Sequence, residues 1–223
     1  MPKPRPLPDR GVFVNCPFNM GYREQFNALI FAVYDCGFYP ICALESADSG
    51  EVRFSKICAL IGECRYAIHD LSRIKIDPNT QLPRFNMVLE LGIYLGAKMF
   101  SGSGGLAKVC VVMDTEQYRY RDFCSDLAGL DIEAHNDAPL KLVCVVRNWL
   151  RNYQEDEELT PDGEHIFNRY KQFLVNLTGR CERVHRNPKS LIFRDYVSML
   201  EGWLAEHDWR GAETLTVQLP SRP

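Results

Sequence analysis

The sequence predicts an α/β fold in which a parallel sheet carries helices on both faces and is followed by a C-terminal helical appendage. Two observations predict it. Between residue 11 and about residue 150, short apolar runs alternate with stretches whose apolar residues keep helical spacing, as in βα units. After residue 160, helical spacing alone is found. We therefore expect an α/β domain over residues 11–151 and a helical appendage over residues 160–210.

The first half of the α/β domain alternates between the two patterns. Its expected elements are, in order, a strand at residues 11–15, a helix at 22–37, a strand at 39–44, a helix at 52–62 and a strand at 65–69. Gly37 is expected to end the first helix, because glycine readily adopts the left-handed conformation of a helix end. The first helix should therefore cover one face of the sheet.

The second half continues the alternation and leads into the appendage. Its expected elements are an apolar helix at residues 87–97, a strand at 108–113, a helix at 118–127, a weak strand at 131–135 and a helix at 139–151. Residues 154–163 combine a charge run with Thr-Pro-Asp-Gly, which predicts a linker or exposed turn. Two amphipathic helices follow at 166–177 and 193–204, and their aromatic stripes should pack on the α/β domain or form a dimer surface.

Glu90 is the leading active-site candidate. From Met87 to Ala97 it is the only charged residue. A helix this apolar is expected to be buried on most sides, and a carboxylate within it must be paired, hydrogen-bonded or raised in pKa. Perturbed carboxylates of this kind are typical of active sites. The alternative is a structural ion pair with Arg53 or Arg84.

Polar side chains follow two of the expected strands. The first strand ends at Asn15, and the stretch at residues 66–72 ends in Asp70 and Ser72. Open α/β sheets bind ligands at the carboxyl ends of their strands, so we expect Asn15 and Asp70 to point into one crevice together with Glu90. Taken singly, Asn15 could cap a turn and Asp70 could cap the next segment.

Composition predicts a soluble cytoplasmic protein. A net charge of −3 and a pI near 6.0 argue against an obligatory nucleic-acid partner, which would need clustered cations. Nine cysteines without a CxxC motif suit a reducing compartment. Residues 1–10 are not apolar enough for a signal peptide, and no apolar run reaches the roughly 18 residues of a membrane span. We expect no membrane partner.

The chemistry that suits Asn15, Asp70 and Glu90 is cleavage of an N-glycosidic bond. Its transition state resembles an oxocarbenium ion, which a buried carboxylate can stabilise or capture, while a second acid binds the sugar hydroxyls. Loops that lead into helix N-termini at residues 18–22 and 83–85 could receive a nucleotide phosphate. The five histidines lack metal-ligand spacing, and we expect neither a metal nor a cofactor.

Three stretches of the chain resemble the superfamily of TIR domains and nucleoside 2-deoxyribosyltransferases. The likeness is carried by Val12-Phe13-Val14-Asn15, Ile68-His69-Asp70-Leu71-Ser72 and Phe85-Asn86-Met87-Val88-Leu89-Glu90-Leu91-Gly92, and it spans roughly residues 11–135. It implies a flavodoxin-like fold in which the Glu of the Glu-Leu-Gly helix, here Glu90, is the catalytic carboxylate. TIR enzymes of this kind cleave nicotinamide from NAD, often in bacterial antiphage defence, whereas the transferases exchange the bases of deoxynucleosides.

Departures from the family pattern concern the residues before Glu90. The transferases carry an acid six residues before this Glu to hold the deoxyribose, whereas this chain has Arg84, which suits a phosphate or carboxylate better. TIR domains have an aromatic or small polar residue near the catalytic Glu, for which Phe85 and Asn86 are loose equivalents. The expected substrate-binding residues are Asn15, Phe18, Asp70, Ser72, Arg84, Phe85 and Asn86.

Three functions are consistent with these observations. The first is an N-glycosidase of NAD or a related nucleotide, acting as an immune effector and gated by a homo-oligomer or an activating partner protein. The second is a deoxyribosyltransferase-like metabolic enzyme, which Arg84 disfavours. The third is a catalytically silent TIR-like module that senses a nucleotide or acts as a scaffold.

Overall fold

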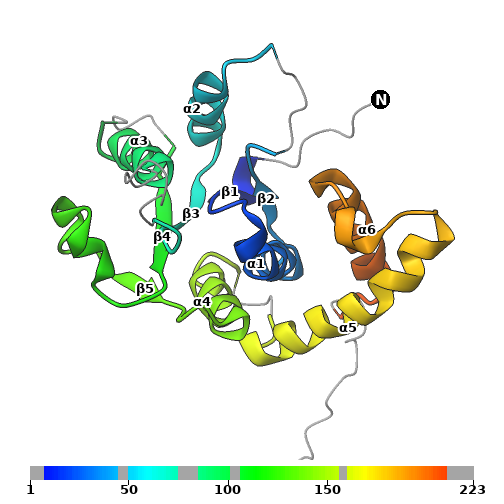
Figure 1. Cartoon of the computed structure of the whole chain (residues 1–223). Helices are drawn as coiled ribbons and strands as arrows, with labels where there is room; N and C mark the ends of the chain where they lie inside the picture. The colour runs from blue at the N-terminus through cyan, green and yellow to red at the C-terminus, as the bar shows by residue number, and fades with distance from the viewer. Residues whose placement is uncertain (1–7, 45–49, 75–84, 101–105, 156–159, 210–223) are drawn as a thin grey trace, which may run out of the picture. The chain divides into compact units, whose positions relative to one another are not determined.

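The structure of the protein is a computed structural model, which describes residues 8–44, 50–74, 85–100, 106–155 and 160–209. Five parallel strands form one sheet in the order β2-β1-β3-β4-β5 (Figure 1). They are β1 (Gly11–Asn15), β2 (Tyr39–Ile41), β3 (Tyr66–Asp70), β4 (Val109–Asp114) and β5 (Ile132–Ala134). This is the strand order of flavodoxin-like folds, and the predicted fold class is confirmed.

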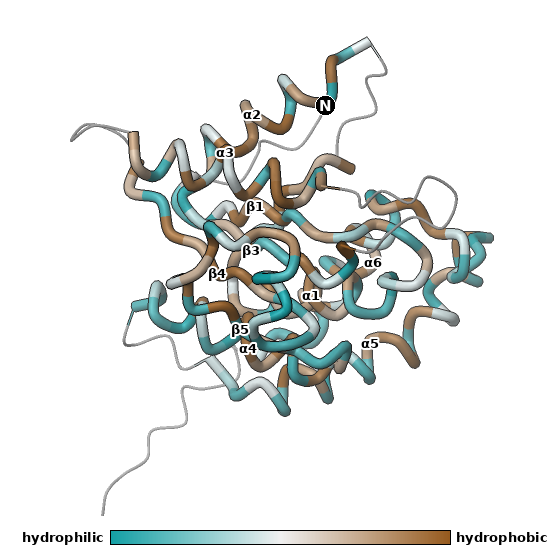
Figure 2. Tube along the Cα trace, turned by 60° about the vertical axis from the view of Figure 1, so that its left-hand side comes forward, coloured by the Kyte–Doolittle hydropathy of each residue, from teal (hydrophilic) through white to brown (hydrophobic). Residues whose placement is uncertain are grey.

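Within the described residues, four helices cover the sheet, two on each face (Figure 1). They are α1 (Arg23–Asp35), α2 (Arg53–Glu63), α3 (Asn86–Phe100) and α4 (Pro139–Arg151). Helices α1 and α4 pack together on one face, which we call the α1/α4 face, and α2 and α3 pack together on the α2/α3 face. Apolar residues concentrate in the central strands, as Figure 2 shows for β1, β3 and β4. Burial of both sheet faces explains why these strands are almost continuously apolar.

The register of β1 and β3 decides which side chains share a face. Phe13 pairs with Ala67, and both pack against α2 and α3. Asn15 pairs with His69, two residues further along each strand. Because side chains alternate along a strand, Asn15 and His69 also point to the α2/α3 face, whereas Asp70 points to the α1/α4 face. The ends of these neighbouring strands therefore direct their polar side chains to opposite sides of the sheet.

Helix α3 is less buried than its composition predicts. Only Leu91 and Tyr94 are fully buried, and Leu89, Met99 and Phe100 are 54%, 75% and 83% exposed. The helix lies on one side of the sheet and packs along α2, so a single stripe of its surface is covered. The prediction of burial on most sides is wrong.

The predicted helix at residues 118–127 is also wrong. Two short 3₁₀ helices, η3 (Arg119–Asp122) and η4 (Ser125–Leu127), take its place. Tyr118 adopts a positive φ of 69°, and the Arg119 side chain donates hydrogen bonds to Asp114 and to the Leu71 carbonyl. These tertiary contacts override the local helical pattern. Two further 3₁₀ helices, η1 (Pro8–Arg10) and η2 (Met20–Tyr22), flank β1.

The end of the predicted linker is held in place rather than exposed. Thr160 is buried, and its hydroxyl donates to Gln154 Oε1 at 2.6 Å. The Arg147 guanidinium donates to the carbonyls of Thr160 and Pro161, each at 2.6 Å. A Cβ at Gly163 would lie 2.7 Å from the Cα of Cys144, so this close approach requires glycine. Residues 156–159 lie outside the described residues.

The chain divides into two compact units, Met1–Lys171 and Gln172–Pro223, and the division falls inside helix α5 (Gly163–Arg183). In the first unit, Arg169 forms a buried ion pair with Asp35 of α1, with Nε 3.0 Å from Oδ2.

In the second unit, Phe173 packs on Tyr196 and Trp203 of helix α6 (Phe193–Glu206), which the 3₁₀ helix η5 (Pro188–Ser190) precedes. These aromatic side chains are buried, so they do not form an exposed apolar surface. No helix in the described parts of the chain is both long and apolar enough to cross a membrane.

Candidate functional site

A cavity of about 340 Å³ lies where β1 and β3 end. The chain leaves these neighbouring strands toward opposite edges of the sheet, which makes this the switch point at which open α/β sheets bind ligands. The volume is at the lower end of the range for ligand pockets. The cavity is lined by Asn15, Cys16, Pro17, Phe18, Asn19, Arg53, Arg73, Asn86, Met87 and Glu90.

Four of the predicted site residues line this cavity together. Asn15 ends β1, and Phe18 follows in the loop before α1, where its ring packs edge-on against Phe26 at 5.4 Å between centroids. Asn86 and Glu90 are four residues apart on α3, so they lie one above the other on the same helix face. The fold thus brings Asn15, Phe18, Asn86 and Glu90 into one concave surface.

Glu90 is the one acid among the described residues that line the cavity. Burial raises the pKa of its carboxyl group, and the nearby Arg53 guanidinium lowers it again in part. Among the described residues, no hydrogen bond or ion pair to the Glu90 carboxylate is found, and Arg53 acts on it only at longer range. Arg84, the other expected ion-pair partner, lies outside the described residues. Glu90 is therefore a partly desolvated carboxylate that faces a cavity.

Asn15 joins the end of β1 to the first turn of α3. Its Nδ2 donates to the Met87 carbonyl at 2.8 Å and lies 3.0 Å from His69 Nδ1. His69 is fully buried, and burial lowers its pKa from 6.5 to about 3, so the imidazole is neutral. Its Nδ1 can accept the second amide hydrogen of Asn15. No local sequence pattern connects His69 with Glu90, because the pairing of His69 with Asn15 depends on the register of β1 and β3.

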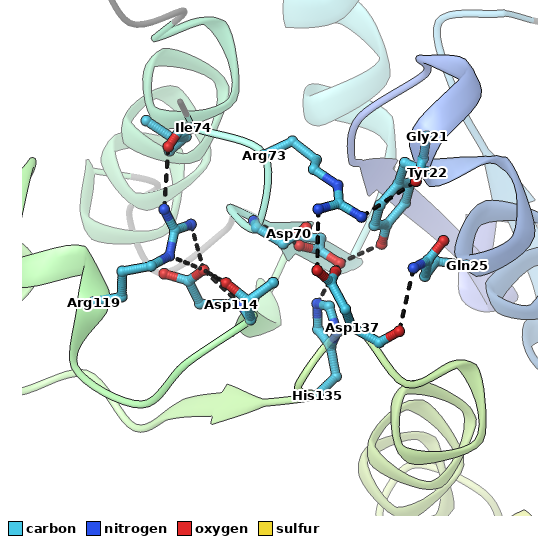
Figure 3. Close-up of polar contacts among 12 residues, drawn as sticks. Gly21, Tyr22, Gln25, Asp70, Arg73, Ile74, Asp114, Arg119, His135 and Asp137 are labelled. Carbon is cyan, nitrogen blue, oxygen red and sulfur yellow. Dashed lines mark hydrogen bonds and ion pairs between the residues drawn. The ribbon is translucent and has the colours of Figure 1, made fainter. Parts of the chain in front are cut away.

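Asp70 and Ser72 do not reach the cavity. Asp70 is fully buried on the α1/α4 face, between Tyr22 and His135 (Figure 3). Its Oδ2 accepts a hydrogen bond from the Tyr22 hydroxyl, and its Oδ1 accepts from the Ser72 amide at 2.8 Å. His135 Nε2 lies 3.1 Å from Oδ2, close enough for an ion pair but not aligned as a hydrogen bond. The expected convergence of Asn15 and Asp70 on one crevice is therefore wrong.

The contacts of Asp70 determine its ionisation. Burial alone would raise the pKa of this carboxyl, but His135, Tyr22 and Ser72 together lower it below 3.8. Burial raises the pKa of the Tyr22 hydroxyl, and the neighbouring Asp70 carboxylate raises it further. Asp70 is thus a charged group whose oxygens are occupied by the protein itself, which suits a structural role at the strand end.

Two arginines line the cavity, and neither was predicted to bind the ligand. Arg53 is the first residue of α2, and Arg73 follows β3. Figure 3 shows how Arg73 is held: it donates to Asp137 Oδ2 at 3.0 Å and to the Gly21 carbonyl at 3.2 Å. Asp137 itself has a positive φ of 54°, an uncommon conformation for a residue other than glycine. The cavity therefore places two cationic side chains near one carboxylate.

The remaining predicted residue, Phe85, is 47% exposed, and it is not among the lining residues. It precedes α3, where its carbonyl accepts a hydrogen bond from the Leu89 amide at 2.9 Å. No group of three His, Cys, Asp or Glu residues that could hold a metal ion is found in the described ranges of the chain.

Comparison with known proteins adds no family assignment. The sequence matches no family model, and no curated protein shows significant similarity to it. The resemblance to TIR domains and deoxyribosyltransferases therefore stays a prediction, and the geometry of the cavity is the main guide to function.

Proposed function

We propose that this protein cleaves the N-glycosidic bond of NAD or a related nucleotide, with Glu90 as the catalytic carboxylate. The observation that carries the proposal is the position of Glu90, which is the one acid among the described residues lining a cavity at the sheet's switch point. A carboxylate in a partly desolvated cavity interacts more strongly with a developing cation than it would in water.

One carboxylate is sufficient for this substrate. In NAD the nicotinamide ring is a pyridinium, so when the C1′–N bond breaks, the bond's electron pair returns to the ring nitrogen and the base leaves uncharged. The ribose C1′ becomes cationic beside Glu90, water adds to it, and that water loses a proton to solvent. A neutral nucleoside would instead need a general acid to protonate its departing base. The described lining contains no second acid, which favours a pyridinium substrate.

The other lining residues suit a nucleotide. Guanidinium groups bind phosphate through paired, charge-assisted hydrogen bonds, so Arg53 and Arg73 favour a phosphorylated ligand. Phe18 is 38% exposed, which leaves part of its ring available to contact a base or a nicotinamide. The side chains of Asn19 and Asn86 can hydrogen-bond with sugar hydroxyls.

The test is a substrate survey with wild-type protein, Glu90→Gln and a matched control, Glu133→Gln, which alters an exposed acid on β5. Each protein is incubated with NAD, NADP and deoxynucleosides, and released base is separated by chromatography. We expect Glu90-dependent release of nicotinamide. Release only from deoxynucleosides would favour a transferase, and nucleotide binding without release would favour a sensing module.

From the resemblance to TIR domains, we further propose that the protein is a cytoplasmic antiphage effector. It becomes active in a homo-oligomer or with a partner protein, since an ungated NAD-cleaving enzyme would harm its own cell. No additional cofactor is proposed, because NAD or the nucleotide is the substrate.

A further inference from the structure

We propose that Asn15 is a positioning residue, which holds the first turn of α3 against the end of β1 so that Glu90 faces the cavity. This inference rests on the proposed role of Glu90, but it concerns how the carboxylate is held rather than what it does. Asn15 is 2% exposed, and its contacts lie between the sheet and the helix rather than within one element.

The hydrogen bonds of Asn15 connect two segments that are distant in sequence. Its Nδ2 donates to the carbonyl of Met87, which precedes Glu90 by three residues on α3. An ordinary helix carbonyl already accepts a bond from the amide four residues later, so the Asn15 bond is an additional one. It therefore fixes the helix turn that carries Glu90 to the rigid end of a central strand.

His69 sets the orientation of the Asn15 amide. The two residues are direct partners in the parallel pair β1–β3, and His69 Nδ1 lies 3.0 Å from Asn15 Nδ2. The other ring nitrogen, Nε2, is buried and has no hydrogen-bond partner among the described residues. A buried unpaired N–H costs about 1–3 kcal/mol, which an apolar residue would avoid. A need for the Nδ1 acceptor explains why a histidine occupies this position.

The amide hydrogens of Asn15 are both used in this arrangement, so its side chain offers no donor to a ligand.

Helix α3 has a second anchor, because the Tyr94 hydroxyl lies 2.5 Å from the Arg65 carbonyl oxygen and 2.9 Å from that of Val109. Glu90 lies between the two anchors along the helix. Loss of the Asn15 anchor should therefore loosen the first turn of α3 and leave the turn around Tyr94 in place.

Amide hydrogen exchange and kinetics on Asn15→Ala test this inference. We expect exchange at Glu90 and Leu91 to accelerate about tenfold, the effect of one lost hydrogen bond, while amides near Tyr94 keep their protection. Nicotinamide release should fall by about 10–100-fold in kcat, with KM changed by less than about threefold. The control Asn176→Ala removes an amide bond to a helix carbonyl in the second unit and should change neither.

Two variants of His69 test whether its Nδ1 acceptor orients the Asn15 amide. They also provide a test if Asn15→Ala does not fold. His69→Asn keeps an acceptor near the Nδ1 position and should retain most of the activity, whereas His69→Leu removes it and should behave like Asn15→Ala. The double variant Asn15→Ala with His69→Leu should lose little more activity than either single variant, because both substitutions break the same interaction. Unchanged exchange in α3, or equal acceleration throughout the first unit, would overturn the inference. Failure of the proposed function would appear separately, as absence of Glu90-dependent base release from wild-type protein.

Discussion

The two faces of the sheet use the polar side chains at the ends of β1 and β3 in different ways. On the α2/α3 face, the neutral pair of Asn15 and His69 lies beside an open cavity and holds the helix that carries Glu90. On the α1/α4 face, Asp70 is a charged group closed in by Tyr22 and His135. The first arrangement leaves a carboxylate available to a ligand, and the second uses a carboxylate to join elements.

The difference comes from a shift of one residue. His69 pairs with Asn15, and Asp70 is the next residue along β3, so its side chain points to the other face. A polar residue at the carboxyl end of a strand is therefore not enough to predict a ligand contact. The face to which its side chain points decides between a functional and a structural role.

The largest expected effect on stability comes from Asp70→Asn. The change removes the charge between Tyr22 and His135 and should lower the free energy of unfolding by about 2–4 kcal/mol. Urea denaturation measures this loss. Asp131→Asn alters an exposed acid and should stay within about 0.5 kcal/mol of wild type. If Asp70→Asn were as stable as wild type, the structural assignment of the α1/α4 face would be wrong.

On the α2/α3 face, His69 should make the free energy of unfolding depend on pH. The pKa of His69 is lowered from 6.5 to about 3 in the folded protein, so between these values the unfolded chain binds the extra proton. The stability that neutral His69 provides is complete above pH 6.5 and decreases as pH falls through this window. We expect a loss of about 2 kcal/mol between pH 7 and pH 5.

The effects of His69 and Asp70 on stability fall in different pH ranges. The pKa of Asp70 is lowered from 3.8, so its contribution is present above that pH and is lost only as pH falls further. Unfolding measured at pH 5–7 should therefore become less pH-dependent in His69→Leu and keep its slope in His165→Gln, which changes an exposed histidine. A wild-type slope in His69→Leu would contradict the assignment.

The smallest expected effects concern the two arginines of the cavity. Arg53→Ala and Arg73→Ala should each raise KM for NAD about tenfold, with a smaller effect on nicotinamide riboside, which carries no phosphate. Arg53→Ala should also move the acidic limb of the pH–rate profile upward, because Arg53 lowers the pKa of Glu90. Arg121→Ala, at an exposed position, is the control. Equal losses with both substrates would argue against phosphate recognition.

Much of the fold could be predicted because its elements are local patterns. The boundaries of β1 and α4 agree with the sequence prediction, and Glu90 could be predicted as a candidate because a charge interrupts an apolar helix. The face taken by Asn15 and Asp70 could not be predicted, because β1 and β3 are apolar on both sides and show no alternation. Arg53 and Arg73 have no local signal in the sequence, since they reach the cavity only through the tertiary placement of α2 and of the segment after β3.

The opposite roles of the two sheet faces are tested most sharply by nicotinamide release from NAD in Glu90→Gln and Asp70→Asn, each normalised to its folded fraction. The two substitutions make the same chemical change on opposite faces of one sheet. We expect Glu90→Gln to be as stable as wild type and at least about 10³-fold less active, because the transition-state cation loses its carboxylate. Asp70→Asn should be less stable but within about threefold of wild-type activity per folded molecule. Full activity in Glu90→Gln, or an equal loss in both variants with the fold intact, would contradict the catalytic role of Glu90 and the structural role of Asp70.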